Sequence, residues 1–266
     1  MKISCSRSKN LLSLFLSARF LFSSSFRINQ RFSRMESLQL NNHVRKSSTL
    51  QIGLTGSIGM GKTTISNQFI KLGFPLFDAD REVHKLYSVN GAAVPRIQEF
   101  YPDVIVDGAV DRNRLSEKIM KDGSVLTVLE RIVHPLVVES RSRFYEQACS
   151  ENRFMVIYDI PLLFENINKY QVDYKIVVTA SPEIQKERVL NRPGMTEEKF
   201  QTILSKQIPD EIKRQKADFL INTDYKGYSE AKSQLAKVIE TIIEKNPTQW
   251  EAWKNSKKIP ENLEEG

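Results

Sequence analysis

Short apolar runs and longer amphipathic stretches alternate along the chain from residue 50 onward. The apolar runs at residues 50–55, 74–77, 154–160, 174–179 and 219–222 are continuous, as expected for strands buried on both faces of a sheet. The stretches between them place apolar residues three and four positions apart, which is typical of helices. This alternation predicts an α/β fold with a doubly wound, mostly parallel sheet that carries helices on both faces.

The segment between the second and third predicted strands contains only helical patterns. These lie at residues 79–90, 93–101, 113–121 and 125–149. A turn-rich link with Asp107-Gly108 separates the second from the third. We expect the last helix to be interrupted at His134-Pro135, because proline has no amide hydrogen to donate within a helix. Residues from about 82 to 150 are therefore expected to form an inserted helical subdomain.

Helix boundaries in the C-terminal half follow from single residues. Ser181-Pro182 is a typical helix start, Pro193-Gly194 ends that helix, and Thr196 opens the next one. An apolar helical stripe then indicates a helix packed on the core, and its members are Ala231, Leu235, Val238, Ile239, Ile242 and Ile243. The domain is expected to span residues 50–245. A polar C-terminal tail follows at residues 246–266, with Trp250 and Trp253 and no assigned role.

Residues 1–35 have a different composition from the rest of the chain. They hold seven Lys and Arg, nine Ser and five Phe, and no acidic residue. This composition favours an organellar transit peptide, which predicts contact with an import machinery and a mitochondrial location. A secretory signal is the alternative, but Arg19 cuts its apolar stretch short. If translation starts at Met35, we expect a cytoplasmic protein. Residues 36–49 are expected to be a polar linker.

The charge of the leader changes how the net charge is interpreted. The chain has 39 Lys and Arg against 32 Asp and Glu, a formal charge of +7. Because the leader holds seven of those bases, residues 36–266 are formally neutral, which disfavours a nucleic-acid partner. Only Cys5 and Cys149 are present, so a disulfide scaffold is excluded. We expect no transmembrane segment, because no apolar run reaches about 18 residues.

The turn after the first strand carries the motif with the clearest chemistry. Its sequence, GSIGMGKT, matches GxxxxGK[ST] and lies between a predicted strand and a predicted helix. The glycines allow a tight turn in which backbone N–H groups converge on phosphate oxygens, and the helix N-terminus adds a positive dipole. Lys62 would contact the β- and γ-phosphates, and the Thr63 hydroxyl would bind Mg²⁺. The residues expected to bind ATP are Gly56, Ser57, Ile58, Gly59, Met60, Gly61, Lys62, Thr63 and Thr64.

Two carboxylates, Asp78 and Asp80, follow the second predicted strand. Because the carboxyl ends of neighbouring parallel strands meet in one crevice, one of these aspartates is expected to face the transferred phosphate. It would accept a proton from an attacking hydroxyl group. An aspartate at this position also commonly caps the following helix, so this structural role remains open for each of them.

The combination of these motifs resembles the dephospho-CoA kinase family over about residues 50–245. The matching segments, in the family's order, are GLTGSIGMGKTT, FDADREVHKL, DGAVDRNRL, His134-Pro135, DIPLLFE, Gln207 and ADFLIN. The resemblance implies a P-loop kinase that moves the γ-phosphoryl group of ATP to the 3′-hydroxyl of dephospho-CoA, with Mg²⁺. It also implies a lid of about residues 188–207 that carries arginines.

The resemblance also implies roles for individual residues. Asp80 would be the general base, and Asp78 would support the local geometry. Lys62, Arg188 and Arg192 would stabilise the charge on the transferred group. Residues expected on the acceptor side are Asp78, Asp80, Arg112, Leu115, His134, Leu162, Leu163, Phe164 and Glu165. Asp159, at a strand end, is a weaker candidate for a water-mediated Mg²⁺ contact.

One segment departs from the family's pattern, and other functions remain open. Asn222-Thr223-Asp224 stands where Asn-Asn-Gly or Asn-Ser-Gly is expected, which leaves the adenine-side contacts undetermined. The alternative enzyme is another P-loop kinase for a nucleotide or small metabolite. A noncatalytic nucleotide-binding module is a further alternative. A GTP-dependent switch is disfavoured, because the loop after the strand at 174–179 has no guanine-recognition sequence.

Overall fold

The computed structural model of the chain describes residues 49–224 and 228–256, apart from the side chains of Lys169 and Tyr228. Its centre is a parallel five-stranded sheet with the order β2-β5-β1-β6-β7. The strands are β1 (Leu50–Thr55), β2 (Leu76–Asp78), β5 (Met155–Asp159), β6 (Tyr174–Thr179) and β7 (Phe219–Asn222). The predicted α/β fold is therefore confirmed, and all five predicted strands are present.

The register of the sheet brings the carboxyl ends of the strands to one edge. Leu54 of β1 and Asp78 of β2 both lie beside Asp159 of β5. On the other side of β1, Thr179 of β6 lies beside Asn222 of β7. Polar residues at the ends of five strands are thereby collected along one edge, where ligands bind in open α/β sheets.

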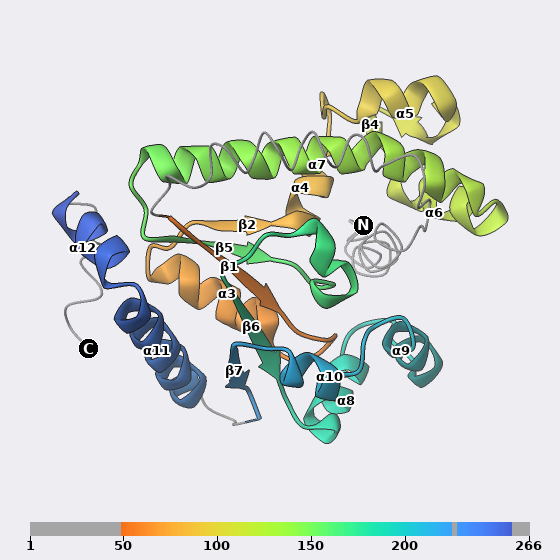
Figure 1. Cartoon of the computed structure of the whole chain (residues 1–266). Coiled ribbons are helices and arrows are strands. Elements are labelled where there is room, and N and C mark those ends of the chain that lie inside the picture. The colour runs from red at the N-terminus through yellow and green to blue at the C-terminus, as the bar shows by residue number, and fades with distance from the viewer. Residues whose placement is uncertain (1–48, 225–227, 257–266) are drawn as a thin grey trace, which may run out of the picture.

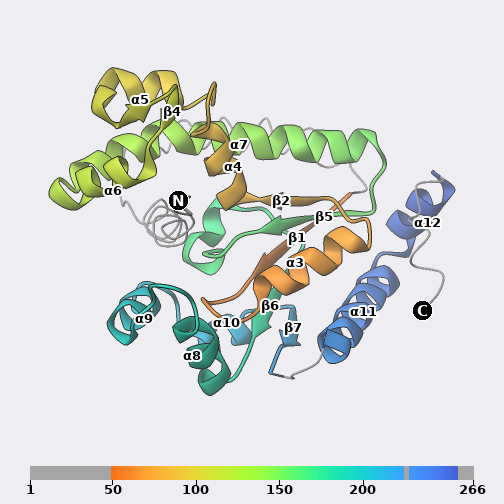
Figure 2. The same ribbon diagram turned by 180° about the vertical axis from the view of Figure 1, so that it is seen from behind.

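Helices cover both faces of the sheet, as Figures 1 and 2 show from opposite sides. On one face, α3 (Lys62–Lys71) and α11 (Tyr228–Lys245) pack Ile65, Phe69 and Leu235 against alternate strand residues such as Ile157. On the other face, the C-terminal half of α7 (Ser124–Ser150) packs against Tyr158 and its neighbours. The predicted apolar stripe of α11 lies in the first of these clusters.

The segment between β2 and β5 forms the predicted helical subdomain. It comprises α4 (Ala79–Leu86), α5 (Val94–Phe100), the 3₁₀ turn η1 (Pro102–Val104), α6 (Arg112–Lys121) and the N-terminal half of α7. The turn-rich link is a small hairpin of β3 (Ile105–Val106) and β4 (Ala109–Val110). Asp107 and Gly108 at its tip have φ values of 50° and 74°, as a two-residue hairpin turn requires. These elements share a hydrophobic cluster of their own.

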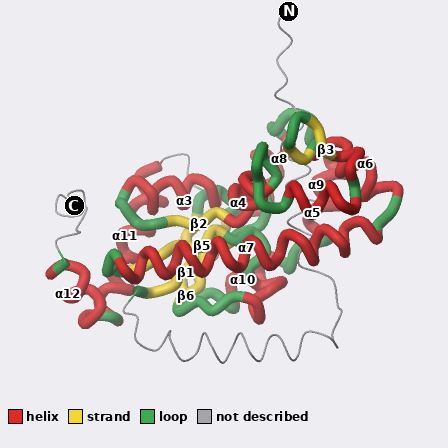
Figure 3. The backbone as a smooth tube through the Cα atoms, turned by 90° about the horizontal axis from the view of Figure 1, so that it is seen from above, coloured by secondary structure: helices red, strands yellow, loops and turns green. Residues whose placement is uncertain are grey.

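The predicted interruption at His134-Pro135 is wrong, because α7 continues through Pro135 as one helix of 27 residues. Leu129 and Val133, in the N-terminal half, are buried in the cluster of the helical subdomain, whereas Ala148 is buried against the sheet. Burial at both ends offsets the missing hydrogen bond at the proline, which costs about 3 kcal/mol. Figure 3 shows α7 running across the molecule, so that it ties the helical subdomain to the sheet.

Three short helices follow β6 at the carboxyl edge: α8 (Pro182–Leu190), α9 (Glu197–Leu204) and α10 (Asp210–Gln215). Thr196 caps α9 by accepting a hydrogen bond from the Lys199 amide, as expected from the sequence. These helices lie on the opposite side of the carboxyl edge from α4 and α6 (Figure 1). The helical subdomain and α8–α10 thus flank the strand ends from two sides.

The segment after α11 is part of the core as far as Asn255. It forms α12 (Pro247–Asn255), in which Trp253 is only 2% exposed and stacks on Phe74. Trp253 also lies against Phe154 and Trp250. The domain therefore extends past the boundary at residue 245 that the sequence suggested, because the two tryptophans pack on the sheet.

The leader, residues 1–35, and nearly all of the linker lie outside the described residues. Within the described ranges, no helix is both long and apolar enough to cross a bilayer. The expected absence of a transmembrane segment stays untested for the leader.

The packing of Trp253 leads to a stability prediction. Trp253→Ala removes a large buried ring between Phe74 and Phe154 and is expected to lower the free energy of unfolding by about 3–5 kcal/mol. Glu251→Ala, an exposed position of the same helix, is the control and should change it by about 0.5 kcal/mol or less. Urea unfolding followed by circular dichroism measures both, and equal effects would contradict a core role for α12.

Candidate active site

The loop between β1 and α3 has the backbone that phosphate binding requires. Gly59 and Gly61 have φ values of 81° and 85°, which side chains other than glycine rarely adopt. A Cβ atom on Gly59 would lie 2.5 Å from Cγ2 of Val189, so the position also lacks space for a side chain. Gly61 is the N-cap of α3, and Lys62, Thr63 and Thr64 form its first turn. The nine residues expected to bind ATP therefore surround one helix N-terminus.

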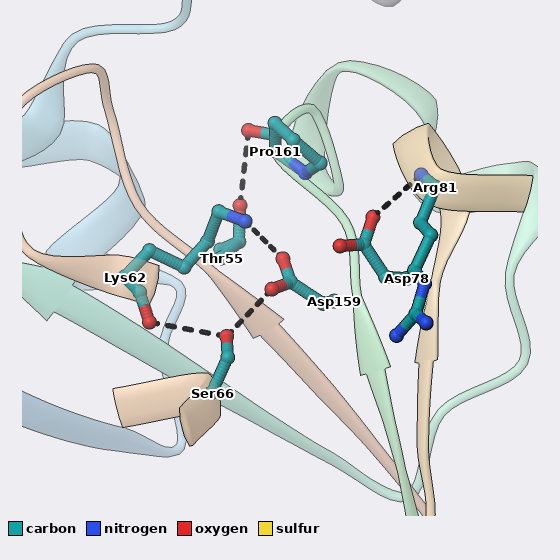
Figure 4. Close-up of polar contacts among 7 residues, drawn as sticks. All are labelled: Thr55, Lys62, Ser66, Asp78, Arg81, Asp159 and Pro161. Carbon is teal, nitrogen blue, oxygen red and sulfur yellow. Dashed lines mark hydrogen bonds and ion pairs between the residues drawn. The ribbon is translucent and has the colours of Figure 1, made fainter. Parts of the chain in front are cut away.

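Lys62 forms an ion pair with Asp159 at the end of β5 (Figure 4). Ser66, one turn further along α3, donates a hydrogen bond of 2.5 Å to the other carboxylate oxygen of Asp159. Asp159 is only 5% exposed, and the Lys62 ammonium and Ser66 hydroxyl groups of α3 compensate its buried charge. Asp159 ranks as a weaker candidate from the sequence, and its pairing with Lys62, 97 positions away, is not visible in any local pattern.

The two aspartates after β2 have different positions. Asp78 is the N-cap of α4, where its carboxylate accepts a hydrogen bond of 2.9 Å from the Arg81 amide (Figure 4). Asp80 lies in the first turn of the helix, where its charge affects the pKa values of Tyr170 and Arg112. Burial raises the pKa of Tyr170, Arg141 lowers it, and the charge of Asp80 raises it further. Asp78 thus has the structural role and leaves Asp80 as the candidate base.

Arg112, expected on the acceptor side, is close to Asp80. Burial lowers the pKa of Arg112, while neighbouring Tyr87 and Asp80 act in the opposite direction. Its guanidinium also lies 2.9 Å from Nδ1 of His84, one turn after Asp80 on α4. Because arginine only donates hydrogen bonds, this His84 nitrogen is the acceptor. No local sequence pattern indicates this contact, because His84 and Arg112 lie 28 positions apart in the chain.

Several residues expected on the acceptor side are instead buried in the structure. Leu115 lies in the core of the helical subdomain and Leu163 in the cluster between α7 and the sheet, both with 0% exposure. Glu165 has a fully buried side chain that pairs with Lys213. In this structure Leu115 and Leu163 pack in hydrophobic clusters and Glu165 pairs with Lys213, so their expected contact with the acceptor stays a prediction. Leu162 and Phe164 are buried as well, whereas Arg112 and His134 are partly exposed.

The arginines of the lid differ in their contacts. Arg188 on α8 donates hydrogen bonds of 2.9 Å and 2.5 Å to the hydroxyl and carbonyl oxygens of Thr223. Thr223 in turn donates to the carbonyl oxygen of Met60 in the P-loop, at 2.9 Å. Thr223 therefore links Arg188 to the P-loop, and Thr223 belongs to the Asn222-Thr223-Asp224 segment that departs from the family's pattern. Arg192, after α8, is partly buried, and this burial lowers the pKa of its guanidinium.

The two helices of the expected lid, α8 and α9, are packed directly on the P-loop. Ile58 of the P-loop shares a hydrophobic cluster with Val189 of α8 and with Phe200 and Ile203 of α9. In addition, Gln185 of α8 donates a hydrogen bond of 2.7 Å to the Ile58 carbonyl oxygen. The lid and the P-loop therefore form one packed unit in this structure.

The donors at the site fit a Mg²⁺ ion that is bound mainly by phosphate and water. In the described part of the chain, no group of three or more His, Cys, Asp or Glu gathers around a point that could hold a metal. The Thr63 hydroxyl in the first turn of α3 and the Asp159 carboxylate beside Lys62 are oxygens that would serve as its protein ligands. Mg²⁺ typically takes only one or two such protein ligands when it accompanies a nucleotide.

Comparison with known proteins gives the family. The model of the dephospho-CoA kinase family matches residues 50–227, most of the described chain. The chain belongs to the dephospho-CoA kinase family. Two relatives carrying that name, from Agrobacterium fabrum and Mesorhizobium japonicum, are 45% and 44% identical over 191 residues. The match covers 72% of this chain and 97% and 95% of theirs.

Solved structures support the same fold. A Thermus thermophilus protein, TT1252, has a TM-score of 0.60 and 26% identity, with 74% of this chain and 97% of that one covered. A Campylobacter jejuni dephospho-CoA kinase has a TM-score of 0.54 and 23% identity, covering 74% and 98%. Both share the α/β architecture. The leader and α12 lie outside the residues that the family model matches.

The position of Asp159 leads to a prediction about metal-dependent binding. Asp159→Asn keeps the shape of the side chain and removes its charge. We expect ATP affinity with Mg²⁺ to fall about tenfold, as for loss of one charge-assisted contact. ATP affinity in EDTA should change much less. Isothermal titration in both buffers measures this, and equal losses would show that Asp159 acts through Lys62 alone.

Proposed function

We propose that this protein transfers the γ-phosphoryl group of ATP to the 3′-hydroxyl of dephospho-CoA to give coenzyme A, with Asp80 as the general base. One observation carries the proposal: β5 pairs in register with β1 on one side and with β2 on the other, so the P-loop, Asp159 and the Asp78–Asp80 segment share one sheet edge. Membership of the dephospho-CoA kinase family supplies the acceptor.

The acceptor side is built around Asp80. Asp78 caps α4 through the Arg81 amide and so fixes the start of the helix whose first turn contains Asp80. As the base, it would accept the proton of the attacking 3′-hydroxyl as the oxygen attacks phosphorus. Arg112 is near enough for the charge of Asp80 to oppose the lowering of its pKa by burial, and its guanidinium contacts His84, so it would hold a negatively charged acceptor on the side of the base.

The nucleotide side is built around the P-loop. Its backbone amides and Lys62 would hold the β- and γ-phosphates, and Lys62 would compensate the charge that develops during transfer. When bound to Thr63 and Asp159, Mg²⁺ supplies further charge compensation at the phosphates. Arg188 and Arg192 lie on the lid side, and the contact of Arg188 with Thr223 brings it close to the P-loop.

Removing the base gives the test of this mechanism. Asp80→Asn should lower kcat by about 10²-fold or more and leave the affinity for ATP within about twofold, because a general base acts in the transfer step. Asp107→Asn, at the exposed tip of the β3–β4 hairpin, makes the same chemical change and should leave kcat unaltered. Product formation from ATP, Mg²⁺ and dephospho-CoA measures both variants.

The acceptor specificity is checked in the same assay. Wild-type protein that phosphorylates adenylate, cytidylate or shikimate, but not dephospho-CoA, would make it another small-molecule P-loop kinase. Retained ATP binding without transfer to any acceptor would instead indicate a noncatalytic nucleotide-binding module.

We further propose that residues 1–35 direct the protein to mitochondria through the import machinery. The support is compositional: seven bases, nine serines and no acids precede a formally neutral domain. The match to the family begins only at residue 50, so the leader lies outside the residues that the family model covers.

The leader can be tested apart from the enzyme. A fluorescent protein fused to residues 1–40 should co-localise with a mitochondrial marker. The same fusion with its seven bases changed to Gln should remain in the cytosol, since import depends on the positive charge of the leader. Entry of the unmodified fusion into the secretory pathway, or a diffuse cytosolic signal, would contradict the proposal.

A further inference from the structure

A buried ion pair joins the segment after β5 to the end of the lid. Glu165, in the 3₁₀ segment η2 (Phe164–Lys169), lies 3.0 Å from Nζ of Lys213 on α10, and both side chains are fully buried. The same carboxylate oxygen accepts a hydrogen bond of 2.8 Å from the Ile208 amide. Burying two charges costs several kcal/mol before their attraction is counted, so such a pair is a poor source of net stability. What it supplies is a defined geometry.

The geometry that Glu165 defines leads directly to the P-loop. Ile208 is preceded by Gln207, whose side-chain oxygen accepts a hydrogen bond of 3.2 Å from the Ile58 amide. The Ile58 carbonyl oxygen is held by Gln185, and its side chain lies in the cluster with Val189. The peptide groups on both sides of Ile58 therefore have fixed orientations. Fixed N–H directions in the phosphate loop are what electrostatic preorganisation requires.

We propose that Glu165 is a positioning residue for the nucleotide half of the site and does not bind the acceptor. Held by Lys213, it fixes the Ile208 amide, and this fixes the Gln207 side chain against the Ile58 amide of the P-loop. The inference rests on the proposed function, because it assigns a role within the same reaction. Its consequence is specific: loss of the Glu165 acceptor oxygen changes the use of ATP and not that of dephospho-CoA.

Two double variants of the full chain separate geometry from charge. E165Q/K213M removes the ion pair but keeps an acceptor oxygen for the Ile208 amide. E165L/K213M removes the ion pair and that oxygen as well. Both avoid leaving one buried charge without its partner, which is strongly destabilising. Steady-state kinetics with ATP and dephospho-CoA are measured well below each variant's melting temperature, so that only folded protein is compared.

We expect E165L/K213M to raise the KM for ATP about tenfold, the effect of losing one positioning hydrogen bond, with the KM for dephospho-CoA within about twofold of wild type. E165Q/K213M should restore the KM for ATP to within about twofold. Q207L should raise it about tenfold by itself. Combining Q207L with E165L/K213M should add little, because both changes act on one chain of contacts.

Three results would overturn the inference. A rise in the KM for dephospho-CoA alone would make Glu165 an acceptor contact. A lower melting temperature with unchanged kinetics would make the pair purely structural. Multiplicative losses on combination with Q207L would show that Glu165 and Gln207 act independently.

A second variant and the wild type keep the test decisive. If E165L/K213M does not fold, I208P removes the amide hydrogen that Glu165 accepts and should give the same rise in the KM for ATP; an unchanged KM would contradict the inference. Wild-type turnover is measured first. Its absence would contradict the proposed function, whereas normal wild-type turnover with insensitive variants would contradict only the role of Glu165.

Discussion

The parallel pairing of β5 with β1 is the constraint on which the rest of the structure depends. Its register sets Asp159 beside Leu54, so that Asp159 meets Lys62 at the start of α3. A shift by one residue would exchange the two faces of β5 and carry Val156 and Tyr158 to the side of α3. Because both faces of β5 are buried, hydrophobic packing fixes its register, and this register places Asp159 within reach of Lys62.

Features that depend on neighbouring residues could be predicted from the sequence. The P-loop follows from glycines and a lysine at fixed spacing, the cap at Thr196 from one hydroxyl, and the sheet from continuous apolar runs. In each case, the residues that determine the structure lie within one or two turns of chain. The family resemblance then adds the identity of the acceptor, dephospho-CoA, which no local pattern contains by itself.

Features that depend on distant contacts could not be predicted in this way. The helical pattern alone indicates a break at Pro135, whereas α7 continues because its two halves are buried against different parts of the molecule. Trp253 lies in a segment of polar composition, and only the folded chain brings Phe74 and Phe154 to it. The DIPLLFE motif marks Glu165 as a candidate site residue but does not indicate which residues its carboxylate contacts. Its partners, Ile208 and Lys213, lie much later in the chain.

The packing on both sides of the site also limits how the protein can enclose its substrates. Moving α8 and α9 away from the P-loop would expose Ile58, Val189 and Phe200, at a cost of about 1.5–3 kcal/mol for each large apolar side chain. On the other side, the uninterrupted α7 ties the helical subdomain to the sheet. Rigid displacement of either part is therefore opposed by buried contacts. The movements that break the fewest buried contacts are those of side chains and connecting loops, and the two hydrogen bonds to Thr223 place Arg188 beside the P-loop without any displacement of α8.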